Sequence, residues 1–158
     1  MTSPEDVLEA IKRRWNQGGS ALPALVAGGL HHARASETFE GGSVQFPYAC
    51  LTISDGEPQY TSASVDTAGG DIILTFDLEL KVYASSEKPN EDTKAIREQI
   101  DFWFNRDSAD GLPIDPPARV MDLRVLAGPG LALSDTRNEG KDVAILTRRW
   151  EITVQGVT

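Results

Sequence analysis

Two groups of residues are of types that can bind a metal ion. His31 and His32 are adjacent imidazoles, and Asp107, Asp110 and Asp115 share one acidic segment. Neighbouring residues of an extended segment point to opposite sides, and no cysteine or acid stands at a zinc-ligand spacing from the histidines. A calcium loop needs oxygen ligands at alternating positions and a closing glutamate, whereas prolines interrupt these aspartates. The sequence therefore predicts no metal site and no cofactor.

Nucleophilic and phosphate-binding chemistry has no better support. Cys50 lies in an apolar segment, where a free cysteine packs as a small hydrophobic residue, and no positioned base is readable beside it. None of the Gly-Gly pairs is followed by the Lys-Ser or Lys-Thr of a phosphate-binding loop. We therefore predict that the chain is not an enzyme.

A small-molecule site on the predicted sheet remains an alternative function. Its candidate polar residues are Tyr48, Tyr83, Asp77 and His32, which show no dyad or triad spacing. Such a site would require these groups to converge in an apolar pocket of ligand size.

The pair Arg148-Arg149 suggests interaction rather than catalysis. It precedes Trp150 in the segment VAILTRRWEITV, whose alternation sends one arginine inward and the other outward. An arginine on an apolar face needs a carboxylate partner or a place in an interface with another chain. Arginine is also enriched at protein interfaces. We therefore predict an ion pair between subunits at Arg148.

Composition indicates one globular domain spanning residues 1–158. The chain is 40% hydrophobic and 25% charged, with a single cysteine and a net charge of −9. No apolar run approaches the roughly 18–20 residues needed to span a bilayer, and no signal-peptide pattern opens the chain, so we expect synthesis in a reducing cytoplasm and no membrane contact. Gripping DNA requires clustered lysine and arginine, so the acidic balance argues against tight nucleic-acid binding.

The clearest structural pattern is the segment DIILTFDLELKVYA, residues 71–84. Its apolar and polar residues alternate with period two, which is typical of a strand with one apolar and one wet face. Similar alternation predicts strands over 48–54, 120–127 and 143–154. The chain therefore contains an open, largely antiparallel sheet that is covered on one side.

Two amphipathic helices are expected to cover that side. Ser3 is predicted to cap the first, with Asp6 completing a capping box. Asn90 is predicted to cap the second. Trp15, Trp103 and Trp150 fit the apolar stripes of their segments, so core packing is favoured over a role as interface anchors.

Together these segments predict an α+β fold, a two-layer sandwich. A mostly antiparallel sheet of about four strands carries two helices on one face. Long polar connections over 55–70 and 128–142 are interpreted as hairpin arms, the first of them mobile, because connections of that length inside a compact domain are usually functional or disordered.

The order of these elements resembles the tail terminator and tail-completion proteins of long-tailed bacteriophages, prophages and gene transfer agents. The resemblance rests on DVLEAIKRRW, PYACLTISDGEP, LELKVYASSEKPNEDTKAIREQIDFWF and the closing strands VMDLRVLA and VAILTRRWEITV with their polar loop. It departs from shorter family members in the arm at 55–70 and in the connection PIDPPA.

The resemblance implies a structural virion protein of the tail or neck, with no catalytic residues. It would form a homo-oligomeric ring, usually a hexamer, on the end of the tail tube, stop tube polymerisation and join the tail to the head-completion or connector protein. DNA would pass through the lumen without specific binding. Another head-tail joining role on the same fold is the alternative. The predicted contact residues are Arg148, Arg149, Glu57, Tyr60, Asp135 and Arg137.

Overall fold

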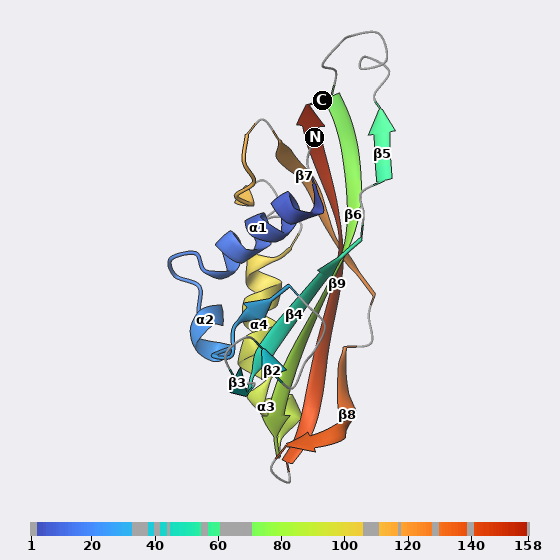
Figure 1. Ribbon diagram of the computed structural model, residues 1–158. Coiled ribbons are helices and arrows are strands. Elements are labelled where there is room, and N and C mark those ends of the chain that lie inside the picture. Colours follow the sequence, from blue (N-terminus) through green and yellow to red (C-terminus); the bar gives the residue numbers. More distant parts are fainter. Residues whose placement is uncertain are drawn as a thin grey trace.

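The chain folds into a twisted sheet with its helices packed on one side (Figure 1). The computed structural model describes residues 3–32, 38–39, 42–43, 45–54, 57–60, 71–105, 111–116, 118–127, 130–138 and 141–157. No helix within these residues is long and apolar enough to cross a membrane.

Helices and strands alternate irregularly along the chain. The helices are α1 (Pro4–Trp15), α2 (Leu22–Leu25), α3 (Pro89–Asp92) and α4 (Lys94–Trp103). The strands are β1 (Leu30–His31), β2 (Thr38–Phe39), β3 (Gly42–Ser43), β4 (Tyr48–Ile53), β5 (Glu57–Tyr60), β6 (Asp71–Ser86), β7 (Arg119–Leu126), β8 (Leu131–Asn138) and β9 (Lys141–Val157).

The sheet is built around one long antiparallel ribbon. Strands β6 and β9 pair along their whole length, from Asp71 opposite Val157 to Ser86 opposite Asp142. On the outer edge of β6, β4 pairs with one half and β5 with the other. On the outer edge of β9, β7 and β8 divide the length in the same way. The strand order across this single sheet is therefore β1-β4-β6-β9-β8 at one end of the ribbon and β5-β6-β9-β7 at the other.

The expected α+β architecture is present, but the sheet is larger than predicted. Within the described residues it has seven strands, antiparallel except for β1 beside β4. The expectation of about four strands was too low because the connections interpreted as arms contain strands. Residues 57–60 form β5, and the predicted loop 128–142 contains the eight-residue strand β8. Both were missed because these segments are mostly polar and show no clear apolar alternation. They become strands because their backbones pair with the long ribbon.

Helix α1 begins where the sequence predicts. The Ser3 hydroxyl accepts a hydrogen bond from the Asp6 backbone N–H at 3.3 Å, and the Asp6 carboxylate accepts from the Ser3 backbone N–H at 2.8 Å. This capping box satisfies two donors that the first turn would otherwise leave without partners. Its apolar stripe, which includes Ile11 and Trp15, is buried against the sheet.

The second helical segment begins differently from the prediction. Asn90 lies within the short helix α3, and α4 starts after a break at Thr93, whose side chain is buried. Ile96 and Ile100 face the core, and Trp103 is partly buried against it. The apolar spacing predicted one helix here. The structure has two, because α3 ends at Asp92 and α4 begins at Lys94.

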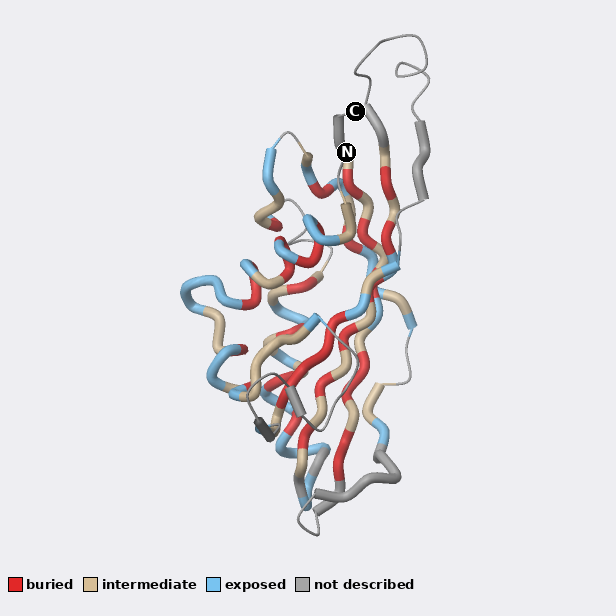
Figure 2. The backbone as a smooth tube through the Cα atoms, viewed as in Figure 1, coloured by how far each residue is buried: buried red, intermediate tan, exposed pale blue. Residues whose placement is uncertain are grey.

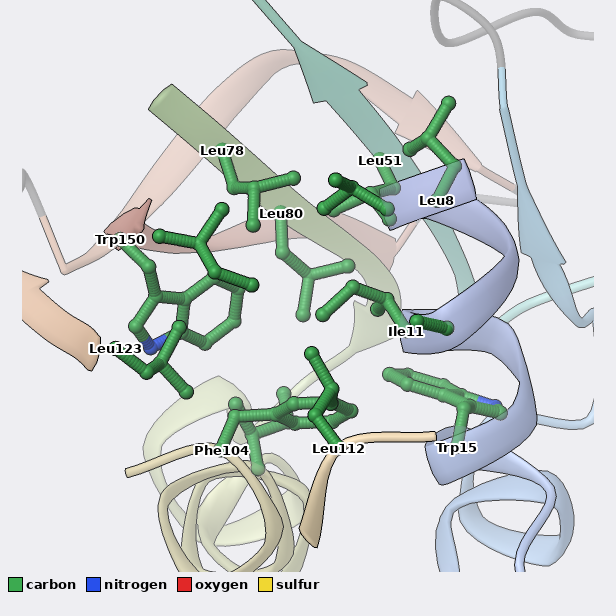
Figure 3. Close-up of a cluster of buried hydrophobic side chains, with 14 of the residues drawn as sticks. Leu8, Ile11, Trp15, Leu51, Leu78, Leu80, Phe104, Leu112, Leu123 and Trp150 are labelled. Carbon is green, nitrogen blue, oxygen red and sulfur yellow. The ribbon is translucent and has the colours of Figure 1, made fainter. Parts of the chain in front are cut away.

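The core lies between the helices and the inner face of the ribbon (Figure 2). Side chains of alternate ribbon residues meet those of α1 and of the α4 end in one continuous cluster (Figure 3). Its largest members include Trp15, Phe76, Phe104 and Trp150, each at most 2% exposed. Leu112, from the connection before β7, closes the cluster beside Phe104. Burial of this apolar surface is the main favourable term in folding.

Candidate interaction surfaces

The outer face of the ribbon, away from the helices, carries a band of alternating charges across β6, β9 and β7. Glu79 and Arg149 are cross-strand partners with their side chains 3.7 Å apart, and Lys81 approaches Glu79 at 3.6 Å. Arg124 reaches Glu151 on the neighbouring strand at 3.2 Å. Partly exposed pairs of this kind contribute little to folding, about 0–1 kcal/mol each. The band therefore acts mainly as a polar surface with both signs of charge.

The same outer face is buried next to this band, at the β4–β8 end of the ribbon. Tyr48 stacks on Tyr83 with ring centroids 4.9 Å apart, and Phe46 packs edge-on against Tyr48. Tyr48 and Thr147 are only 5% and 4% exposed. The prediction that the whole outer face is exposed to solvent is therefore wrong at this end. Alternation shows which residues share a face of a strand, but it does not show whether other segments cover that face.

Cys50 lies in the same buried region. Removal of its side chain from water raises the pKa of the Cys50 thiol, an effect that the nearby Lys81 charge only partly opposes. Burial likewise raises the pKa of the Tyr83 phenol. A thiol that resists ionisation is a poor nucleophile, in agreement with the structural role that the sequence indicates.

Arg148 has a carboxylate partner within its own chain. Its guanidinium donates two hydrogen bonds to the Asp101 carboxylate near the end of α4, at 3.0 and 3.4 Å, and a third to the Thr147 carbonyl. This pair accounts for an arginine on the inner face of β9 without any second subunit. A contact between Arg148 and another subunit stays a prediction.

The Arg148–Asp101 pair borders an open hollow of about 370 Å³. The hollow lies where β7 ends and β8 begins along the edge of β9, and its lining includes Phe104, Val125 and Gly130. The residues suggested for a small-molecule site do not line it: Tyr48, Tyr83 and Asp77 lie on the outer face of the sheet, and His32 follows β1. The structure does not bring that predicted site together.

The remaining predicted contact residues fall at opposite ends of the ribbon. Glu57 and Tyr60 lie on β5, which pairs with the first residues of β6, whereas Asp135 and Arg137 lie on β8, which pairs with the first residues of β9 (Figure 1). Because the ribbon is antiparallel, these starts are far apart. The two segments cannot form one site, and each belongs to a different end of the molecule.

No group of metal-binding side chains occurs within the described part of the chain. The His31 ring lies 2.7 Å from the Gly28 carbonyl oxygen, so one imidazole nitrogen serves the local backbone. Of the three candidate aspartates, Asp107 and Asp110 lie outside the described residues. Asp115 binds Arg13 of α1 at 2.8 Å, and this guanidinium lowers the pKa of the Asp115 carboxyl.

Sequence reasoning missed two features of the surface. Asp101 was not identified as the partner of Arg148, because the contact joins residues 47 positions apart and no local pattern signals it. Met121 and Val125 are 44% and 52% exposed on β7, although both belong to a predicted strand. Met121 lies at a shift of register where β7 bulges against β9, which alternation alone does not reveal. Val125 lies opposite Trp150 and lines the open hollow.

Comparison with solved structures finds a protein with the same fold. The chain is similar to one in the structure described as "Virion of native gene transfer agent (GTA) particle", with a TM-score of 0.50 and 17% sequence identity. The likeness covers 95% of this chain and 92% of that one. No protein-family model matches the sequence, and no curated protein matches it at a significant level.

Proposed function

We propose that this chain is a structural protein of a phage-like particle that forms a ring on the end of a tail tube. There it stops tube polymerisation and joins the tail to the head connector. The observation that supports the proposal is the fold likeness to a chain of a gene transfer agent virion, which takes in nearly the whole of both chains. The sequence resemblance supports the tail-terminator role in particular.

The geometry suits a protein that works between two partners. The ribbon holds sixteen cross-strand pairs, so its ends lie up to about 50 Å apart at the usual rise per residue. Strand β5 stands at one end and β8 at the other, each leading into a polar segment. One end would contact the tail tube and the other the head side. The net charge of −9 suits a lumen through which DNA passes without being held.

Electron microscopy of the purified protein at high concentration tests the ring. Annular particles are expected, and addition to growing tail tubes should arrest their elongation. Tubes that elongate normally in the presence of excess protein would contradict the terminator role. Binding to isolated connectors without any effect on tubes would instead favour the alternative, another head-tail joining protein.

The two ends can be tested separately. We expect Glu57→Lys with Tyr60→Ala to impair one partner contact, and Asp135→Lys with Arg137→Glu to impair the other, while rings still form. Glu91→Lys, on the exposed surface of α3, is the matched charge-reversal control. Equal loss of both contacts in both variants would contradict a division of roles between the ends.

The contact predicted at Arg148 needs a control for its role inside the chain. Arg148→Ala and Asp101→Ala break the same internal ion pair, so both should destabilise the subunit by a similar small amount, about 0.5–1 kcal/mol. If Arg148 also contacts a neighbouring subunit, only Arg148→Ala will reduce ring formation measured by light scattering. Identical ring formation by the two variants would remove Arg148 from the interface.

A further inference from the structure

Strand β7 presents an open edge. It pairs with β9 on one side, and among the described residues no strand pairs with its other side. Such an edge offers unpaired backbone donors and acceptors to another chain. Met121 and Val125 on this strand are among the large hydrophobic side chains that the described structure leaves exposed.

The two edge strands in this half of the sheet, β5 and β7, differ in whether they contain proline. Strand β5 contains Pro58, which has no backbone N–H to donate along an edge. Natural proteins keep edge strands from pairing with proline, with charged residues such as lysine and with β-bulges. The sequence of β7, RVMDLRVL, contains neither proline nor lysine, and its bulge at Met121 lies at one end of the strand.

This sequence is complementary to itself when two copies run antiparallel. Placing Leu123 of one copy opposite Leu123 of the other sets Asp122 against Arg124, and Arg124 against Asp122. Both of these residues lie on the outer face of the sheet, since their partners on β9 are Thr153 and Glu151. Opposite charges directly across two strands are favourable, so both pairs support this register.

The exposed apolar residues fit the same register. With Leu123 at the centre, Met121 of each copy comes opposite Val125 of the other. Pairing would therefore bring these exposed side chains into contact with each other across the two copies. Charge complementarity and hydrophobic complementarity both favour the same register of the two β7 strands.

We propose that β7 is a docking edge for a second copy of this chain, joined antiparallel about a two-fold axis at Leu123. The contact is isologous, so it closes after two copies and cannot propagate around a ring. It describes a dimer of the free protein, in which the edge is covered before the protein meets its other partners. It does not rest on the proposed ring, whose contacts must run head to tail.

Two charge variants and their mixture test the register. In Asp122→Arg each cross-strand pair becomes two arginines, and in Arg124→Asp each becomes two aspartates. We expect each variant alone to dimerise at least about tenfold more weakly than the unaltered protein in sedimentation velocity. Mixed one to one, they present opposite charges at both positions and should recover dimers that contain one copy of each.

The matched control is Lys94→Asp. It breaks an exposed ion pair, with Glu98, but lies at the start of α4 and not on the sheet, so its dimerisation should be unchanged. A mixture that stays monomeric while both variants are folded would overturn the proposal. Dimers that are insensitive to all three changes would do the same, because they would place the two-fold contact on another surface.

Hydrogen exchange on the unaltered protein tests the same contact and does not depend on any variant folding correctly. Hydrogen exchange of the backbone amides of residues 122–126 should slow as protein concentration rises through the dimerisation range, while that of the exposed helix α3 stays constant. Exchange in β7 that is independent of concentration up to about 1 mM would overturn the proposal. This result would leave the ring untouched, since it concerns the two-fold edge alone.

Discussion

The middle of the outer sheet face differs from its β4–β8 end although the same alternating pattern runs through both. In the middle of the ribbon, where β7 meets β9, the face carries the charge band of Glu79, Arg124, Arg149 and Glu151, in which every side chain keeps about a third or more of its surface in water. At the β4–β8 end the same face buries Tyr48 and residues beside it. The middle is therefore a polar surface open to partners, and the β4–β8 end belongs to the subunit's own packing.

The difference teaches where changes will unfold the subunit and where they will only alter its contacts. Substitutions at the buried end should lower the free energy of unfolding. Substitutions in the charge band should leave that free energy nearly unchanged and act, if at all, on assembly. The following predictions run from the largest expected effect to the smallest.

Gly28→Ala should be the most damaging change at the buried end. A Cβ at this position would overlap the Gln45 carbonyl oxygen and stand 2.8 Å from both the Pro47 oxygen and the Tyr48 Cβ, and backbone cannot yield cheaply. We expect a loss of about 3 kcal/mol or more in urea unfolding, because the start of β4 must move. Gly18→Ala, whose Cβ would meet nothing within 4 Å, is the control. Equal stability of the two variants would contradict the close approach.

Tyr48→Ala should cost nearly as much. The change removes a side chain that is 5% exposed and that stacks on Tyr83, so it leaves a cavity as well as losing buried apolar area. We expect about 3 kcal/mol of destabilisation by thermal or chemical unfolding. A loss below about 1 kcal/mol would mean that this end of the outer face is as open as the charge band.

Alkaline pH should weaken the folded state through the buried end. The pKa values of Cys50 and Tyr83 are raised in the folded chain, so the native state keeps protons that the unfolded state loses. Stability is therefore fully present below about pH 8.5, where unfolded cysteine begins to ionise, and falls as pH rises from there. Melting temperatures between pH 7 and 10 should show this decline. The double variant Cys50→Ala with Tyr83→Phe should flatten it, and an unchanged slope would contradict the assignment.

Glu79→Gln, in the charge band, should have the smallest effect. It removes the charge that faces Arg149 and Lys81, and exposed pairs of this length contribute about 0–1 kcal/mol. We expect the free energy of unfolding to change by no more than about 0.5 kcal/mol, with less difference still at high salt. A loss as large as that of Tyr48→Ala would erase the distinction between the two regions.

Much of the fold was readable along the chain because local rules decide it. The capping box of Ser3 and Asp6, the apolar stripe of α1 and the alternation of β6 and β9 all reflect interactions among near neighbours in sequence. The location of β5 and β8 was not readable, since polar segments become strands here by pairing with a ribbon that is distant in sequence.

The candidate surfaces were predicted less well than the fold. Arg148 stood out because it interrupts an apolar face, but its partner Asp101 comes from another element, brought close only by packing of α4 on the sheet. The exposed edge of β7 depends on which strand ends the sheet, and strand order is a property of the whole chain. Neither could be inferred from spacing.

By itself the sequence determined the class of fold, the side of each long strand that faces the core, and the absence of readable catalytic motifs. These follow from the periods of helix and strand and from side-chain chemistry, which need no distant contact. Only the tertiary structure decided which half of the outer face is covered, which carboxylate serves Arg148 and which edge stays open. Those outcomes depend on contacts between segments far apart in the chain, and burial is set by what arrives on a surface rather than by the residues that form it.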